Sequence, residues 1–286
     1  MHLKPLLGIY EKALPRQLDW EERFRRVVDS GFDFMELSID ESDERLGRLE
    51  WPLAERLAFT RAALLAGIRV PSMCLSAHRR FPLGSADPEL RKESRRIMEA
   101  AILFAADTGI RVIQLAGYDV YYEASNAESR RRYLEGMEGA LEFAEGRQVM
   151  LAVEIMDTTF LNSIAKYRAL KERLPSPWFA LYPDLGNLSA WGNDVEGELA
   201  IGIDDIVGIH IKETKPVLPD FPGAFRDVPF GEGSVDFVGA FAALKRLGYA
   251  GPFLVEMWTE KAPDPLAEIS HARDWVLERL RAAGYQ

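Results

Sequence analysis

The chain has 286 residues, of which 48% are hydrophobic and 28% charged, a balance typical of a globular domain. Its formal net charge of -10 disfavours sequence-independent binding to nucleic acid, because an acidic surface repels phosphate backbones. We find no apolar run long enough for a membrane span and expect no secretory signal at the N-terminus. The single cysteine excludes an intrachain disulfide, so we expect a reducing, cytoplasmic location.

Short apolar runs alternate with longer amphipathic stretches along the whole chain. The runs lack strict alternation of polar and apolar residues, which is typical of strands buried on both faces of a sheet. We predict eight strands, at Leu6–Ile9, Phe34–Leu37, Val70–Leu75, Val112–Leu115, Met150–Glu154, Trp178–Tyr182, Val207–Ile211 and Phe253–Glu256.

Helical patterns separate these strands. The first begins after Asp19, a typical N-cap, and ends before Gly31. Longer helices are predicted at Pro88–Ala106, Asn126–Ala144 and Pro263–Ala283. Glycine follows a helix at Gly67, Gly109 and Gly248, where it suits a C-terminus with positive φ. Eight strand–helix units predict one α/β domain over residues 1–286, a single TIM-type (β/α)8 barrel, with an open doubly wound sheet as the alternative.

In such a barrel, chemistry takes place where the strands end. Four consecutive predicted strands end on acidic residues or a histidine: Glu154, Asp184, His210 and Glu256. Converging buried carboxylates repel one another, so one divalent cation is their natural compensation. An imidazole with three carboxylates suits Zn²⁺, Mn²⁺ or Co²⁺, and Mg²⁺ is an alternative. For any single acid, the alternative is an ordinary ion pair at the barrel rim.

The segments around these four residues resemble a known family. They read Glu154-Ile-Met-Asp-Thr-Thr, Tyr182-Pro-Asp-Leu-Gly-Asn, Ile209-His-Ile-Lys-Glu-Thr and Glu256-Met-Trp-Thr-Glu-Lys. In combination they are similar to the xylose-isomerase-like barrels and, within these, to the L-ribulose 5-phosphate (L-xylulose 5-phosphate) 3-epimerases of L-ascorbate and related pentose pathways. Ala77 and Glu213 stand where Gly and Asp are expected in close relatives, and neither position is a predicted ligand.

The resemblance implies an isomerase that inverts C3 of a ketopentose 5-phosphate through an enediolate. The metal would stabilise the negative charge, while Glu154 and Glu256 act in turn as base and acid from opposite faces. Asp184 and His210 would be primarily ligands. The expected partners are a small sugar phosphate and a second copy of the chain in a homo-oligomer, a dimer, with neither nucleic acid nor membrane.

Four further residues are candidate substrate contacts. Arg226 resembles a substrate-binding arginine of the family, with a rim ion pair as the alternative. Asn187 places an amide near the sugar or caps a turn. His78, just past the third strand, is a contact or a surface histidine. Lys261 and the glycines of segment 231–233 suit the 5-phosphate.

Three other functions are weighed against this one. The first is a 3-epimerase of an unphosphorylated ketose, or a related sugar isomerase, and the phosphate contacts decide between them. The second is an endonuclease at abasic DNA sites, which the net charge of -10 and the presence of only four histidines disfavour. The third is a non-catalytic sugar-binding barrel, which has no need of two opposed glutamates.

Overall fold

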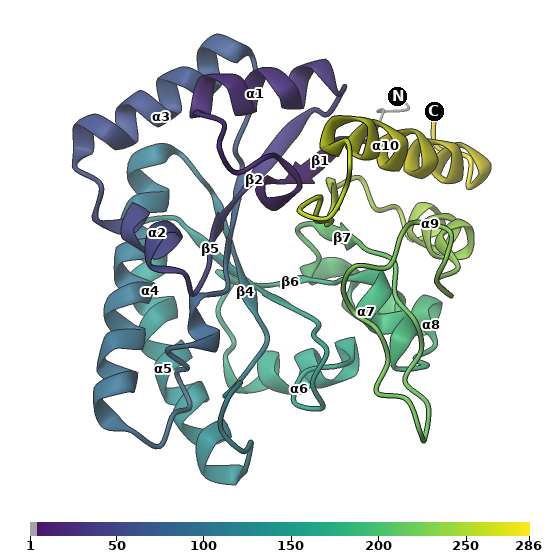
Figure 1. The fold of residues 1–286 in the computed structure, drawn as a ribbon. Helices are drawn as coiled ribbons and strands as arrows, with labels where there is room; N and C mark the ends of the chain where they lie inside the picture. Colours follow the sequence, from purple (N-terminus) through teal and green to yellow (C-terminus); the bar gives the residue numbers. More distant parts are fainter. Residues whose placement is uncertain (1–4) are drawn as a thin grey trace.

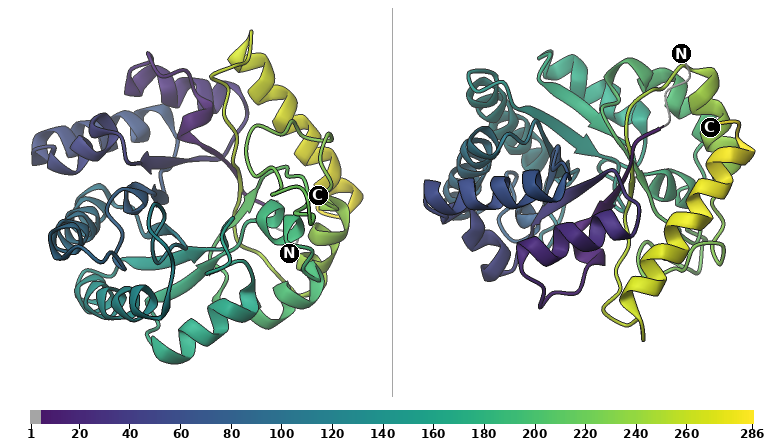
Figure 2. Two further views of the ribbon diagram at one scale, coloured as in Figure 1. Left: turned by 60° about the horizontal axis from the view of Figure 1, so that its bottom comes forward. Right: turned by 90° about the horizontal axis from the view of Figure 1, so that it is seen from above.

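The computed structural model describes residues 5–286 as eight parallel strands surrounded by helices (Figures 1 and 2). The strands are β1 (Leu7–Tyr10), β2 (Phe34–Ile39), β3 (Ser72–Leu75), β4 (Val112–Ala116), β5 (Met150–Glu154), β6 (Phe179–Tyr182), β7 (Ile209–Ile211) and β8 (Phe253–Val255). Each strand expected from the apolar runs is present, with its ends shifted by at most two residues. Only Val112 and Met150, at the starts of their strands, are not fully buried.

The strands follow the order β6-β5-β4-β3-β2-β1-β8-β7, and β6 and β7 meet to complete the circle. The backbone N–H of Val207 donates to Leu181 O at 3.0 Å, and that of His210 donates to Pro183 O at 2.9 Å. Asp184 and His210 are bridge partners at this seam. The prediction of a barrel is therefore confirmed, and two predicted ligands lie where it closes.

The helices lie outside the strands and begin and end largely where the sequence predicts. They are α1 (Trp20–Asp29), α2 (Asp43–Leu46), α3 (Leu53–Ala66), α4 (Pro88–Thr108), α5 (Ala127–Glu145), α6 (Ile164–Arg173), α7 (Leu185–Ala190), α8 (Val195–Gly202), α9 (Phe237–Arg246) and α10 (Pro265–Ala282). Short 3-10 helices are η1 (Glu11–Ala13), η2 (Gly47–Glu50), η3 (Ala77–Arg79) and η4 (Ile203–Asp205). Within the described residues, none of these helices is both long and apolar enough to cross a membrane.

The helix ends follow the local chemistry of the chain. The Asp19 carboxylate accepts the backbone N–H of Glu22 at 2.8 Å and caps α1. Gly67, Gly109 and Gly248 have φ of +73°, +77° and +79°, a region that residues with a Cβ rarely adopt. The predicted turns from helix to strand are therefore confirmed at all three glycines.

A buried ion network fixes the segment that follows β1. The Glu11 carboxylate is fully buried and accepts from Arg48 at 2.7 and 2.9 Å, from Arg23, and from the backbone N–H of Ser38 at 2.9 Å. Arg45 lies 3.8 Å away. Burial alone would raise the pKa of Glu11, but the guanidinium groups of Arg48, Arg23 and Arg45 hold it below its usual value. This network joins the β1–α1 loop to the end of β2.

We predict that Glu11→Gln lowers the free energy of unfolding by about 3–5 kcal/mol, because it leaves buried guanidinium groups without a counter-charge. Since the pKa of Glu11 is lower in the folded than in the unfolded chain, this stabilisation is present at neutral pH. It is lost as the pH falls through the folded-state pKa. Urea unfolding of the two proteins measures the difference.

The matched control is Glu44→Gln, which breaks an exposed pair with Arg16. Exposed pairs contribute about 0–1 kcal/mol. A similar loss in the two variants would contradict the role of the buried network.

Candidate functional site

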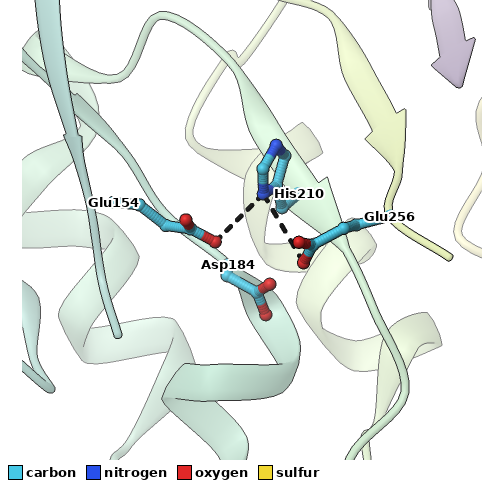
Figure 3. A group of neighbouring side chains, drawn as sticks. All are labelled: Glu154, Asp184, His210 and Glu256. Atoms are coloured by element: carbon cyan, nitrogen blue, oxygen red, sulfur yellow. Dashed lines mark hydrogen bonds and ion pairs between the residues drawn. The ribbon is translucent and has the colours of Figure 1, made fainter. Parts of the chain in front are cut away.

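Glu154, Asp184, His210 and Glu256 come together at the carboxyl end of the barrel (Figure 3). One ligand atom from each residue lies within 4.8 Å of the others. Glu154 ends β5, His210 lies within β7, Asp184 is two residues beyond the end of β6, and Glu256 directly follows β8. Asp184 and His210 are fully buried, and Glu256 is 9% exposed.

The His210 ring is held from behind by a carboxylate of β2. Its Nε2 lies 3.0 Å from Glu36 Oε1, and Ser72 Oγ donates to Glu36 Oε2 at 2.7 Å. Its Nδ1 faces the cluster, 3.0 Å from Glu154 Oε1 and 3.8 Å from Glu256 Oε2. Donation from Nε2–H to Glu36 orients the ring and directs Nδ1 toward the cluster, where it could bind a metal ion.

The electrostatics of the cluster favour a bound cation. Burial alone would lower the pKa of His210, but the carboxylates of Glu154 and Glu36 raise it, so a metal ion would bind at Nδ1 in exchange for a proton. Burial also raises the pKa of Asp184. Burial opposes ionisation of Glu256 too, yet Lys212 and His210 hold its pKa below the usual value.

Each carboxylate of the cluster has a fixed neighbour. The Gln114 side-chain amide of β4 donates to Glu154 Oε2. Lys212 Nζ lies 2.8 Å from Glu256 Oε2 and 3.0 Å from Asp184 Oδ2. These last two oxygens are buried and accept no well-directed hydrogen bond, although Lys212 lies beside both. Three carboxylates with free lone pairs and one imidazole form a donor set that could hold a divalent metal ion.

Helix α7 packs closely against the end of β7 and thereby positions Asp184 and Asn187. A Cβ at Gly186 would lie 2.3 Å from the Lys212 carbonyl oxygen, so only glycine fits there. Asp184 Oδ1 accepts the backbone N–H of Asn187 at 2.7 Å, so Asp184 is the cap of the helix. The buried Asn187 amide donates to Ile155 O at 2.8 Å and lines the cavity above the cluster.

That cavity has a volume of about 220 Å³. Its walls combine acidic, basic and aromatic side chains: Glu154, Glu256, Asp157, Lys12, Arg79, Lys212, Arg226, Tyr10, Tyr121, Phe225 and Trp258. Sites for drug-sized ligands occupy roughly 300–1,000 Å³, so this smaller polar cavity suits a small sugar.

Arg226, a predicted substrate contact, lies on the wall of this cavity. Its guanidinium stands 4.4 Å over the Trp258 ring and 3.2 Å from Glu260 Oε2. The rim ion pair is therefore present, and the contact to the substrate stays a prediction.

Two other candidates lie away from this cavity. Lys261 is exposed, pairs with Asp227, and lines a second cavity of about 270 Å³. The backbone N–H of Gly231 donates to Glu213 Oε2 at 3.0 Å, so it is already engaged. Lys261 therefore shares a cavity with Glu256 and Lys212, whereas segment 231–233 lines neither of the two cavities.

His78 turns away from the cavity. Within η3 its Nε2 lies 3.2 Å from the carbonyl oxygen of Ser94 on α4, and burial lowers the pKa of His78 to about 4. The neutral ring therefore donates to that carbonyl. The chain turns sharply after Ser76, so that the next residue, Arg79, lines the cavity instead.

Comparison with known proteins agrees with this geometry. Residues 24–279 match the model of the xylose isomerase-like TIM barrel family. The chain is 58% identical, over 98% of both chains, to a putative L-ribulose-5-phosphate 3-epimerase, SgbU, of Escherichia coli (strain K12). It is 56% identical to the L-ribulose-5-phosphate 3-epimerase UlaE of Escherichia coli (strain SE11), over 97% of this chain and 96% of that one. The chain belongs to the L-ribulose-5-phosphate 3-epimerase family of xylose isomerase-like barrels.

Solved structures share the fold of this family at much lower identity. An L-ribulose 3-epimerase superposes with a TM-score of 0.78 at 22% identity, covering 98% of this chain and 96% of that one. A D-psicose 3-epimerase from Clostridium cellulolyticum H10 does so with a TM-score of 0.80 at 15% identity, covering 97% and 99%. At these identities the structural similarity supports the assignment of the barrel fold and nothing further.

Three polar residues around the cluster were missed from the sequence: Glu36, Gln114 and Lys212. Glu36 and Gln114 each interrupt an apolar strand, and a buried polar residue needs a partner. A polar residue within an apolar strand therefore predicts a buried interaction at both positions. It does not identify the partners, which lie on strands distant in the sequence.

We predict that Glu36→Gln weakens Mn²⁺ binding about 10–100-fold, because a neutral group behind His210 holds and polarises the imidazole less well. Isothermal titration of the metal-stripped protein with Mn²⁺ measures this. Glu41→Gln, which alters a carboxylate just beyond β2 that contacts Tyr122, is the control and should bind as the unchanged protein does. Equal affinity in all three proteins would contradict the role of Glu36.

Proposed function

We propose that this chain is a metal-dependent 3-epimerase that interconverts L-ribulose 5-phosphate and L-xylulose 5-phosphate. One observation carries the proposal: Glu154 and Glu256 lie on opposite sides of one buried cluster and line the same cavity (Figure 3). The relatives at 58% and 56% identity bear the name of this activity, which supports the choice of substrate.

The reaction inverts the carbon next to the C2 ketone. A base takes the C3 proton, and the electron pair of the broken C–H bond moves toward C2 to form an enediolate. A proton then returns to C3 on the opposite face, and the ketone re-forms. No oxidant or further reactant is needed, so two proton-carrying groups on opposite faces suffice.

Glu154 and Glu256 are suited to these two positions. Strands β6 and β7 lie between β5 and β8 on one side of the barrel, so the two carboxylates approach from either side of His210 (Figure 3). Glu154 is held by the Gln114 amide, and before a metal ion binds Glu256 lies beside the Lys212 ammonium. One glutamate removes the C3 proton of a given epimer and the other delivers a proton, and their roles exchange in the reverse direction.

The metal ion belongs to the same proposal. Glu154, Asp184, His210 and Glu256 would hold one divalent ion, and the imidazole suits Zn²⁺, Mn²⁺ or Co²⁺ better than Mg²⁺. When bound, the ion supplies Lewis-acid stabilisation of the negative charge of the enediolate.

We propose Arg79 and Lys12 as contacts for the 5-phosphate. Arg79 lines the cavity with its guanidinium 5.5 and 5.2 Å from the ring centroids of Tyr118 and Tyr121. Its Nε has no hydrogen-bond partner, although the Tyr118 hydroxyl and the Asp157 carboxylate interact with its guanidinium. Lys12 adds a second cation, paired with Asp40 at 2.6 Å. A phosphate dianion suits such a pair of donors.

The remaining sequence-based expectations are unchanged. The endonuclease interpretation stays disfavoured by the net charge of -10. Assembly as a dimer and a cytoplasmic location stay predictions. Asn187 and Arg226 stay proposed substrate contacts because both line the cavity.

We predict that the protein, incubated with L-ribulose 5-phosphate in deuterated water, forms L-xylulose 5-phosphate and introduces deuterium at C3. Proton NMR follows both events. Chelation should abolish the reaction, and Mn²⁺, Co²⁺ or Zn²⁺ should restore it. Full activity in protein that elemental analysis shows to be metal-free, or deuterium at a different carbon, would overturn the proposal.

The same assay tests the phosphate. Unphosphorylated L-ribulose should react with a lower kcat/KM than its 5-phosphate. Arg79→Met should lower kcat/KM for the phosphorylated substrate about 10–100-fold, since hydrogen bonds to charged groups contribute about 1.5–3 kcal/mol. The same substitution should leave kcat/KM for the unphosphorylated substrate nearly unchanged. Equal rates for both substrates would instead indicate a 3-epimerase of a free ketose.

We predict that Glu154→Gln and Glu256→Gln, each assayed at saturating metal, stop net epimerisation but retain one-sided exchange. The remaining glutamate can still remove the C3 proton that faces it and return deuterium to the same face. Each variant should therefore label one epimer, and the two variants should label opposite epimers. If both label the same epimer, or if either epimerises at a near-normal rate, the two-base assignment is wrong.

A further inference from the structure

Lys212 lies inside the candidate metal centre, although nothing in its sequence context marks it as a ligand. It is two residues beyond His210 at the end of β7, so both side chains point to the same side of the strand. Its Nζ is 2.8 Å from Glu256 Oε2 and 3.0 Å from Asp184 Oδ2, and its side chain is only 8% exposed. The ammonium therefore contacts two of the four proposed ligands.

The charges around the centre show why a cation is needed there. Glu154, Asp184 and Glu256 converge on one point, and Glu36 adds a fourth carboxylate behind His210. Among the described residues, Lys212 is the one lysine or arginine with an ion contact to the three clustered acids. Buried carboxylates without a counter-charge destabilise the fold. Lys212 supplies that counter-charge from within the chain.

A divalent ion held by the same residues needs the same oxygens. The ion and the ammonium would both lie close to Asp184 and Glu256, and two like charges at such separations repel strongly in a buried site. We propose that Lys212 is the built-in counter-ion of the centre, a positioning residue that holds Asp184 and Glu256 and that an incoming metal ion displaces. This inference rests on the metal site of the proposed function.

A second cavity can accept the displaced ammonium of Lys212. Lys212 also lines the second cavity, of about 270 Å³, between the loops that follow β7 and β8. That cavity is lined by Glu213, Glu260 and Glu268. The side chain can therefore leave the centre and still keep acidic groups near its charge.

Removing this ammonium should separate metal affinity from the stability of the metal-free protein. In Lys212→Met, purified with Mn²⁺ and then stripped, we expect a lower melting temperature than in the unchanged protein without metal. We also expect the Mn²⁺ dissociation constant to fall by at least about tenfold, because the competing positive charge is gone. Damage to the fold alone would have the opposite effect, because it would weaken Mn²⁺ binding.

Three further variants make the test specific. Lys12→Met removes an equal charge from the same cavity, but from an ammonium paired with Asp40, and should change the Mn²⁺ dissociation constant less than about threefold. Lys212→Arg keeps the charge and should not tighten binding. Lys212→Gln retains a hydrogen-bond donor, so it should tighten binding even if the methionine variant does not fold without metal.

The possible outcomes distinguish the two proposals. If the unchanged protein binds one Mn²⁺ and both neutral variants bind it equally or more weakly, the counter-ion role of Lys212 is overturned while the metal site stands. If the unchanged protein binds no Mn²⁺ at this cluster, the metal site fails and the inference fails with it. Tighter binding in the neutral variants, together with a less stable metal-free protein, supports the inference.

Discussion

The concentration of negative charge at the mouth of the barrel is the constraint on which the rest of the site depends. Three carboxylates at the ends of β5, β6 and β8 converge within 4.8 Å, in a place where they are largely shielded from water. Burial of ionised carboxylates without compensation costs several kcal/mol each. The surrounding polar residues are the compensation: the Gln114 amide, the imidazole oriented by Glu36, and the Lys212 ammonium.

The barrel itself creates this convergence. Parallel strands direct all their carboxyl ends to one rim, so a single strand-end residue from each of four neighbouring strands meets the others with little help from loops. The seam between β6 and β7 closes through Asp184 and His210, so the residues that complete the fold are also residues of the site. Stability and chemistry are therefore coupled there, and a change in either residue affects both.

Much of this arrangement could be predicted from the sequence, for physical reasons. Buried parallel strands appear as apolar runs, and glycines with positive φ mark the helix ends, so the barrel and its rim follow directly. The partners of the rim residues do not follow, because Glu36 lies 174 positions before His210 and pairs with it only through the closed barrel. The expectation for His78 failed for a local reason: a 3-10 turn directs its ring to α4 and brings Arg79 to the cavity.

The central claim is that these strand-end residues hold one divalent ion. Anomalous diffraction from crystals soaked in Zn²⁺, recorded on both sides of the zinc edge, tests it most directly. The claim predicts one strong peak, about 2.0–2.2 Å from a carboxylate oxygen of Glu154, Asp184 and Glu256 and from His210 Nδ1. Lys212 Nζ should then have moved away from the oxygens of Asp184 and Glu256. A peak bound elsewhere, or none at the cluster while its carboxylates and Lys212 keep their present contacts, would contradict the claim.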